Sequence, residues 1–264
     1  MGCRLWPDQP GRRRSVTIPS LGAVGKVVVV TGASKGLGRA MALGFAEAGA
    51  DVVVASRKLE QCQRVADEVT AIGRQALAVR CHVGDWNQCE ELVDAVVARF
   101  GRIDVLVNNA GIAPVPPSLL GVTAELFDKT IAVNLRGPLR LTALAVEHMP
   151  SGGSVINISS KAALHPTSFT VVYAAAKAGL NALTKAAAHE FGPRGIRVNA
   201  IVCGTFQTDS FHSSMPSEQA QAEMAARVSL GRIASADEIV GSALFLASDA
   251  SSYLTGGLVV LDGG

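Results

Sequence analysis

Residues 26–38 read KVVVVTGASKGLG, and this stretch decides the fold. Its first half is a continuous apolar run without alternation, which is typical of a strand buried on both faces of a parallel sheet. Its second half places Gly32, Gly36 and Gly38 where a helix-like segment begins. Glycines there let backbone N–H groups approach a pyrophosphate at the helix N-terminus. Strand, glycine turn and helix in this order predict a dinucleotide-binding unit.

Outward from this stretch, short Val/Ile-rich runs alternate with longer amphipathic segments. The runs span 26–31, 51–56, 75–81, 104–108, 154–159, 196–202 and 258–261, and the helix-like segments span 36–49, 59–72, 87–100, 124–148, 170–191 and 236–248. This alternation predicts an α/β fold: a single-domain Rossmann-type, doubly wound sheet of seven mainly parallel strands, with helices on both faces. Residues 205–230 lack a strand pattern, and we interpret them as a helical or mobile excursion.

Composition excludes several classes of protein. The 264 residues are 48% hydrophobic, without an apolar run near the roughly 20 residues that cross a bilayer, so we expect a soluble protein with no membrane contact. The net charge is only +2, and four arginines fall within the first 14 residues, so the remaining chain lacks the cationic face that nucleic acid needs. Five cysteines without a C-x-x-C pair indicate reduced thiols and a cytoplasmic location.

The first 24 residues form a basic, proline-containing extension ahead of the predicted domain at 25–264. We expect this extension to be disordered. A mitochondrial presequence fits its arginines but not its three prolines and Asp8, and a twin-arginine signal would need the apolar run that the first strand already uses.

The residues at the end of the second predicted strand indicate which cofactor the protein prefers. A carboxylate there would bind the ribose 2′-hydroxyl of NAD, but the chain has Ser56, Arg57 and Lys58, with Lys35 in the glycine turn. Three cations suit the 2′-phosphate of NADP(H), which we therefore favour over NAD(H). The alternative is that Arg57 and Lys58 only begin a solvated helix. The glycine turn adds contacts from the residues Gly32, Ser34, Lys35, Gly36, Leu37 and Gly38.

Three candidate catalytic residues, Ser160, Tyr173 and Lys177, lie at or after the end of the fifth predicted strand. Tyr173 and Lys177 are four residues apart, so they share one face of a predicted helix. Ser160 ends the fifth predicted strand, and ligands of open α/β sheets bind at the carboxyl ends of strands. A Tyr-x-x-x-Lys pair alone is common by chance, and only this setting makes it a candidate catalytic site.

With these motifs the chain resembles the short-chain dehydrogenase/reductase family in its compact form of about 250 residues. The resemblance covers residues 26–264. It rests on the glycine turn, on Asn108-Asn109-Ala110-Gly111, on Asn134, on Ser160, Tyr173 and Lys177, on Arg197-Val198-Asn199-Ala200, on Gly204 with Thr208, and on the closing Thr255-Gly256-Gly257 and Asp262-Gly263-Gly264. It implies further cofactor contacts from the residues His82, Val83, Asn109, Ala110, Gly111, Tyr173, Lys177 and Thr208.

The resemblance also implies a mechanism. Tyr173 would exchange a proton with the substrate oxygen, Lys177 would stabilise the phenolate, Ser160 would orient the substrate, and Asn134 would anchor a water that links Lys177 to solvent. No metal is implied. Two departures stand out: His82 replaces the usual aspartate near the adenine, and Cys203 replaces the usual proline before Gly204. We expect weaker adenine discrimination from the first, and we interpret Cys203 as a small buried hydrophobe.

The predicted activity is NADP(H)-dependent interconversion of a carbonyl and a secondary alcohol. Its small-molecule substrate, a modest and largely apolar ketone or secondary alcohol, would meet Ile112 to Val115, Leu164, His165, Phe169 and the 205–230 excursion. Alternatives are a 3-oxoacyl-thioester reductase of fatty-acid synthesis, for which Lys129, Arg136 and Arg194 would supply carrier-protein contacts, an NAD-linked alcohol dehydrogenase, and a non-catalytic dinucleotide-binding regulator. The family resemblance and the Ala-rich 174–188 segment predict a homotetramer.

Overall fold

The computed structural model describes residues 20–208, 211, 213, 215 and 217–264. Its centre is a seven-stranded sheet in the order β3-β2-β1-β4-β5-β6-β9, in which every neighbouring pair is parallel. The strands are β1 Val27–Thr31, β2 Asp51–Ser56, β3 Ala76–Arg80, β4 Val105–Asn108, β5 Ser154–Ser160, β6 Arg197–Cys203 and β9 Leu258–Leu261. The order reverses between β1 and β4, which confirms the predicted doubly wound sheet.

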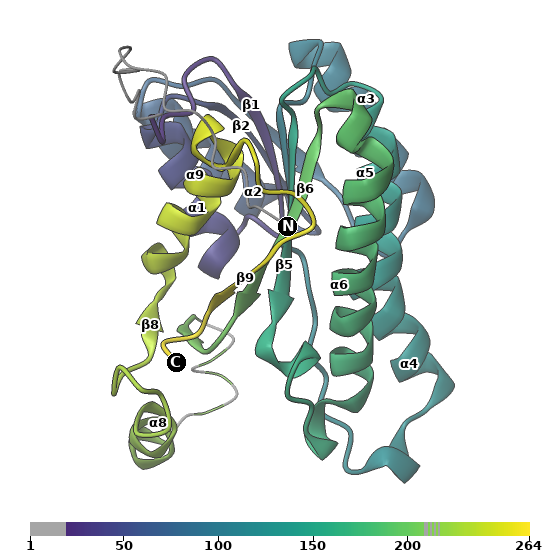
Figure 1. Cartoon of the computed structure of the whole chain (residues 1–264), viewed down its shortest axis with the longest axis vertical. Helices are drawn as coiled ribbons and strands as arrows, with labels where there is room; N and C mark the ends of the chain where they lie inside the picture. Colours follow the sequence, from purple (N-terminus) through teal and green to yellow (C-terminus); the bar gives the residue numbers. More distant parts are fainter. Residues whose placement is uncertain (1–19, 209–210, 212, 214, 216) are drawn as a thin grey trace, which may run out of the picture.

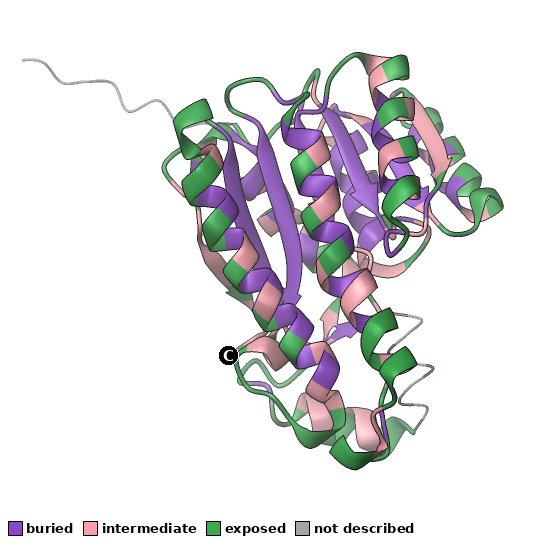
Figure 2. Ribbon diagram, turned by 90° about the vertical axis from the view of Figure 1, so that its right-hand side faces the viewer, coloured by how far each residue is buried: buried purple, intermediate pink, exposed green. Residues whose placement is uncertain are grey.

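Helices cover both faces of this sheet because its strands are apolar on both sides. One face packs on α1 (Gly36–Glu47), α2 (Leu59–Ala71) and α9 (Val240–Ala247), and the other packs on α3 (Trp86–Phe100), α5 (Gly137–Val146) and α6 (Val171–Phe191). Figure 1 shows these two helical layers on either side of the strands, and Figure 2 shows the buried strands beneath helices whose outer faces are exposed. Alternate residues of β1 point to opposite layers, Val28 and Val30 to one and Val27 and Val29 to the other.

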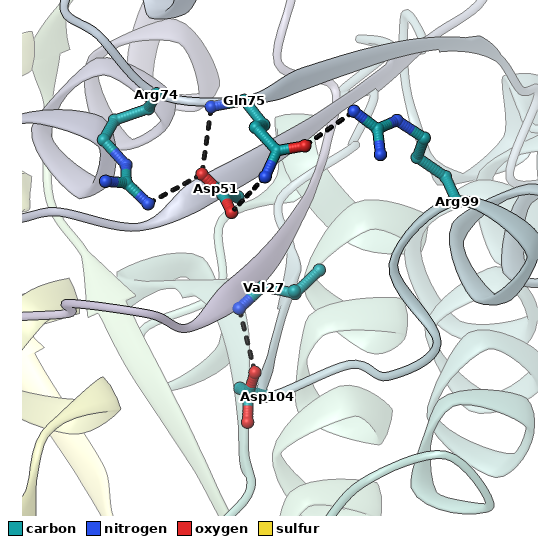
Figure 3. Close-up of polar contacts among 6 residues, drawn as sticks. All are labelled: Val27, Asp51, Arg74, Gln75, Arg99 and Asp104. Atoms are coloured by element: carbon teal, nitrogen blue, oxygen red, sulfur yellow. Dashed lines mark hydrogen bonds and ion pairs between the residues drawn. The ribbon is translucent and has the colours of Figure 1, made fainter.

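Polar contacts join the amino-terminal ends of neighbouring strands, opposite the end of the sheet where the candidate site lies. The Asp51 carboxylate accepts hydrogen bonds from Arg74 at 2.8 Å and from the Gln75 backbone at 2.9 Å. The Asp104 carboxylate accepts one from the Val27 backbone at 2.9 Å. Figure 3 shows both groups, which tie the start of β2 to the residues before β3 and the start of β1 to the residue before β4. These ties hold the starts of neighbouring strands together.

Two predicted segments differ in detail from the structure. The helix expected at 124–148 consists of α4 (Ala124–Ile131), a π-helical turn (Ala132–Arg136) and α5. The excursion at 205–230 contains α8 (Glu218–Ala225) and also a short strand β7 (Phe206–Gln207), which pairs with β8 (Ala234–Ser235). The interpretation of a strand-free excursion was therefore wrong, because a two-residue strand is too short to leave a periodic signal.

The beginning of the described chain already packs on the domain. Ala23 is 1% exposed, and its backbone donates a hydrogen bond to the Ala48 carbonyl at 2.8 Å. Residues 1–19, which hold the basic part of the predicted extension, lie outside the described residues. No helix within the described ranges is long and apolar enough to cross a bilayer.

Candidate active site

The glycine turn after β1 is packed so closely that side chains are excluded from it. A Cβ atom on Gly38 would lie 2.3 Å from the Gly32 carbonyl oxygen, and one on Gly32 would lie 2.9 Å from the Ala110 Cα. Gly32 and Gly36 also have φ angles of +65° and +53°, which L-residues rarely adopt. No side chain caps α1, and its first turn contains no acid, so its N–H groups remain available to an anion. This cradle fits the pyrophosphate of a dinucleotide.

A threonine that the sequence analysis did not select, Thr31, joins the glycine turn to the residues after the neighbouring strand β4. The Thr31 hydroxyl accepts hydrogen bonds from the backbone N–H groups of Asn109 at 3.0 Å and Ala110 at 3.1 Å. The Asn109 side chain donates in return to the Thr31 carbonyl at 2.8 Å. The ends of β1 and β4 are therefore locked together, and Asn109 acts on the shape of the glycine turn as well as lining the cavity beside it.

The three predicted cations surround the end of β2. Lys35, Arg57 and Lys58 are exposed and line the same cavity. The Ser34 hydroxyl donates to the Ser56 hydroxyl at 3.1 Å, which joins the glycine turn to this strand end. None of the three cations has an ion-pair partner among the residues described here. Their charges are therefore available to an anionic ligand.

Ser160, Tyr173 and Lys177 meet where β5 ends and α6 begins. The Lys177 ammonium lies 5.8 Å from the centroid of the Tyr173 ring and donates a hydrogen bond to the Ile158 carbonyl at 2.7 Å. Lys177 is only 3% exposed, and this burial lowers its pKa to about 8. Burial also raises the pKa of the Tyr173 phenol. A hydrogen bond with Ser160 lowers this pKa, but burial has the larger effect. In the protein alone the phenol is therefore protonated near neutral pH.

The expectation that Lys177 stabilises the Tyr173 phenolate concerns the complex with the oxidised nicotinamide and stays a prediction. The Lys177 ammonium lies over the ring face, and in the protein alone desolvation is the largest cause acting on the pKa of the phenol. Cys203 lies nearby and is 6% exposed; burial raises the pKa of its thiol to about 12, although Lys177 acts in the opposite direction. The Cys203 thiol is therefore un-ionised at neutral pH, as expected for a small buried hydrophobe.

Asn134 lies beneath the cavity. It belongs to the π-helical turn and is fully buried, and its side chain donates to the carbonyls of Ile112 at 2.8 Å and Thr130 at 2.9 Å. Its amide oxygen accepts from the Ile112 backbone at 3.2 Å. A Cβ atom on Gly111 would lie 3.0 Å from that oxygen and 3.7 Å from the Lys177 ammonium, so Gly111 leaves the space between the two side chains open.

One cavity of about 1200 Å³ connects these groups across the carboxyl ends of the strands. Its lining includes the predicted residues Gly32, Ser34, Lys35, Gly36, Leu37, Gly38, Ser56, Arg57, Lys58, His82, Val83, Asn109, Ala110, Gly111, Ser160, Tyr173, Lys177 and Thr208. Of the predicted site residues, only Asn134 is absent from this lining. The described residues contain no group of three or more His, Cys, Asp or Glu side chains that could hold a metal ion.

The predicted substrate pocket matches the cavity only in part. Of the predicted segment Ile112 to Val115, all but Val115 line the cavity, and so do Thr205 and Phe206 of the excursion. Leu164, His165 and Phe169 do not. Phe169 is 62% exposed. The sequence analysis selected Lys129 of α4 but missed Glu125 and Leu126, which line the cavity from the same helix. The i, i+4 spacing of Glu125 and Lys129 was the available signal, but it does not reveal which way a helix faces.

The fold and the site are those of nicotinamide-dependent oxidoreductases, and the similarity to known proteins agrees. Residues 32–264 match the family profile described as enoyl-(acyl carrier protein) reductase. The chain is 39% identical over 248 residues to the L-rhamnose 1-dehydrogenase (NAD(P)(+)) of Azotobacter vinelandii, covering 91% of this chain and 96% of that relative. It is 38% identical over 242 residues to the 3-oxoacyl-[acyl-carrier-protein] reductase FabG of Thermotoga maritima, covering 91% and 97%.

A solved structure gives the same result in three dimensions. The blue fluorescent protein from a metagenomic library, in complex with NADPH, superimposes with a TM-score of 0.85 at 33% identity, covering 91% of this chain and 98% of that one. This chain therefore belongs to the short-chain dehydrogenase/reductase family. It is an oxidoreductase of the kind that acts on CH–OH groups with a nicotinamide dinucleotide, as the sequence analysis predicted.

Proposed function

We propose that this protein interconverts a carbonyl and a secondary alcohol, prefers NADP(H) to NAD(H), and uses Tyr173 as the general acid and base. The observation that carries the proposal is the cavity that joins the glycine turn and its three cations to Ser160, Tyr173 and Lys177. When bound, the nicotinamide supplies or accepts the hydride. All other steps belong to side chains of this chain.

In the direction of reduction, the protonated Tyr173 phenol donates its proton to the carbonyl oxygen, and the Ser160 hydroxyl orients that oxygen. The raised pKa of Tyr173 favours the protonated donor form near neutral pH. The Lys177 ammonium donates a hydrogen bond to the Ile158 carbonyl, and it supplies positive charge beside the ring as Tyr173 loses its proton. Asn134 braces the Ile112 segment and the π-helical turn against the site, and we propose that it anchors the water that returns a proton to Lys177.

The role of Tyr173 is tested by Tyr173→Phe. Loss of general acid catalysis should lower kcat by about a hundredfold or more, because proton transfer typically contributes that much. The dissociation constant for NADPH should stay within about threefold, since the ring that lines the cavity is kept. Turnover that survives in the variant would contradict the mechanism, while NADPH binding without turnover in the wild type would favour a non-catalytic regulator.

The cofactor preference is tested by titrating NADPH and NADH separately while following cofactor fluorescence. The double variant Arg57→Ala/Lys58→Ala should weaken NADPH binding by about a hundredfold or more and leave NADH nearly unchanged, because charge-assisted hydrogen bonds to phosphate are lost. Arg64→Ala is the matched control, since Arg64 is an exposed cation of α2 that does not line the cavity. Equal effects on both cofactors would show that the cations do not read the 2′-phosphate.

Reduction of a 3-oxoacyl thioester is the second candidate, favoured by the similarity to the Thermotoga maritima reductase. Of the three cations proposed for a carrier protein, only Lys129 lines the cavity. Arg136 donates to the Gly84 carbonyl at 2.6 Å and Arg194 to the Val146 carbonyl at 2.7 Å, so both are engaged within the fold. Rates with an acetoacetyl thioester, an aldose and a simple ketone separate the candidates. A thioester preference that Lys129→Ala removes would support this one.

A further inference from the structure

The residues at the end of β9 hold both ends of the excursion that follows β6. At the start of the excursion, the Gly204 backbone donates a hydrogen bond to the Leu261 carbonyl at 2.9 Å. At its end, the Leu230 backbone donates to the Gly263 carbonyl at 3.1 Å. Figure 1 shows the chain after β9 running down beside β8 toward α8. Residues 261–264, which we call the clamp segment, therefore close the excursion into a loop at its base.

The clamp segment packs against both ends of the excursion without spare room. Gly263 has a φ angle of +80°, and a Cβ atom on it would lie 2.5 Å from the Val228 Cγ1 atom. Val228 is only 8% exposed, so its side chain has little space into which it could move. At the other end, a Cβ atom on Gly204 would lie 2.6 Å from the Asp262 Cα atom. A side chain added at either glycine would therefore push the excursion away from the clamp segment.

The excursion also supplies one wall of the cavity, next to the catalytic residues. It leaves the sheet after Cys203, which is the register partner of Ser160 in the pairing of β6 with β5. The residues that it contributes to the cavity lining are Thr205, Phe206, Thr208 and Phe211. We call these four residues the excursion wall. Because the excursion begins beside Ser160, the position of this wall sets the space available to a substrate there.

We propose that the clamp segment positions the excursion wall for substrate binding, with Gly263 as its positioning residue. The clamp segment is itself fixed to the sheet, because Leu261 of β9 pairs with Cys203 of β6. The excursion wall contacts the part of the substrate beyond the carbonyl oxygen, which Ser160 and Tyr173 hold. Displacing the wall therefore weakens substrate binding and leaves proton transfer nearly unchanged. This role rests on the proposed function, since the cavity is taken to hold the carbonyl substrate.

Gly263→Ala tests this role through steady-state kinetics at saturating NADPH, with the best of the three carbonyl substrates named above. The added methyl group displaces Val228 and with it the end of the excursion, so KM for the carbonyl substrate should rise about tenfold or more. The kcat and the dissociation constant for NADPH should stay within about threefold. An unchanged KM would overturn the role in positioning, and so would a fall in kcat as large as the rise in KM.

Two further variants separate the contact from backbone strain. Gly73→Ala is the matched control: Gly73 has a φ angle of +90° after α2, and apart from its chain neighbours no atom of the described residues lies within 4 Å of its Cβ position. Its KM should equal that of the wild type. Gly263→Ala/Val228→Ala removes the Cγ1 atom that the new methyl group meets, so its KM should return toward that of Val228→Ala alone. A KM as high as in Gly263→Ala for either variant would contradict the proposal.

Limited proteolysis with trypsin measures the clamp independently of activity. Arg227 is exposed and immediately precedes the buried Val228, so trypsin cleaves after Arg227 when the end of the excursion opens. Mass spectrometry of the fragments should show this cleavage about tenfold faster in Gly263→Ala than in the wild type or in Gly73→Ala. Equal cleavage rates would refute the clamp. A wild type that reduces none of the three carbonyl substrates would instead count against the proposed function, and the cleavage rates would still decide the clamp.

Discussion

At the scale of single residues, Lys177 shows how burial changes the chemistry of a side chain. Its ammonium is enclosed between α6 and β5 and has one backbone acceptor, the Ile158 carbonyl. Removing a charge from water disfavours the charged form, which is why its pKa falls to about 8. Lys177 is thus able to exchange a proton within a unit or so of physiological pH, which an exposed lysine does not do.

This shift predicts a pH-dependent cost to stability. The unfolded chain holds the Lys177 proton up to about pH 10.5 and the folded chain only to about pH 8, so below pH 8 the fold carries the full cost of burying the charge. The cost fades as pH rises from 8 to 10.5. Relative to Lys177→Met, the wild type should gain about 2–3 kcal/mol of unfolding free energy between pH 7 and pH 10.

The measurement is urea unfolding of both proteins at matched concentrations across that pH range. The backbone hydrogen bond lost in Lys177→Met shifts the difference by a constant and does not affect its slope. A difference that stays flat with pH would mean that the Lys177 pKa is not depressed in the folded protein.

At the scale of elements, a buried polar ladder fixes α6 against the sheet. The Asn108 side chain of β4 donates to the Asn157 side chain of β5 at 2.9 Å, and Asn157 donates to the Thr184 hydroxyl of α6 at 2.9 Å. The Thr184 hydroxyl donates in turn to the Leu180 carbonyl at 2.8 Å. All of these groups are buried, so each depends on the next for satisfaction. The ladder sets the height of α6, and therefore of Tyr173 and Lys177, relative to Ser160.

Replacing Thr184 with valine tests the ladder. The shape is kept, but the Asn157 amide is left without its acceptor, which should cost about 1–3 kcal/mol of unfolding free energy. Thr184→Ser keeps the hydroxyl and loses one methyl group, so it should cost about 1 kcal/mol. Urea unfolding midpoints measure both. If serine proves as costly as valine, packing of the methyl group and not the hydrogen bond holds the helix.

At the scale of the whole molecule, large apolar side chains remain exposed on two separate faces. Phe127 of α4 and Leu139 of α5 are 47% and 43% exposed on the helical layer. Val260 is 51% exposed on β9, the strand at one edge of the sheet. Exposed apolar groups on a helical face and on an open sheet edge suit two distinct self-complementary interfaces, and two such interfaces would together build a tetramer with two-fold axes.

We propose that the protein is a homotetramer, and light scattering should return a mass close to four times the 27.3 kDa of the chain. Val260→Glu should reduce that mass, because a charge would be buried at the sheet-edge interface. Val24→Glu is the matched control, since Val24 is 82% exposed at the start of the domain. A monomeric mass for the wild type would refute the assembly.

The amino-acid sequence by itself determined the layered fold, because each of its signals is local. An apolar run such as 27–31 requires burial on both faces, and glycines at 32, 36 and 38 require a turn that no other residue fits. Similarly, the spacing of Tyr173 and Lys177 places both on one helical face wherever that helix packs. These features depend on neighbours within one element, so periodicity and residue type reveal them.

Only the tertiary structure decided which distant residues meet and how water is excluded. Lys129 lines the cavity, whereas Arg136 and Arg194 donate to backbone carbonyls within the fold. Phe169 is exposed, and Asn134 is buried outside the cavity lining. The tertiary structure also buried the Tyr173 phenol, and this burial raises the pKa of Tyr173 in the protein alone. Desolvation and contacts across elements depend on how helices and strands pack together, and no local pattern of residues encodes that packing.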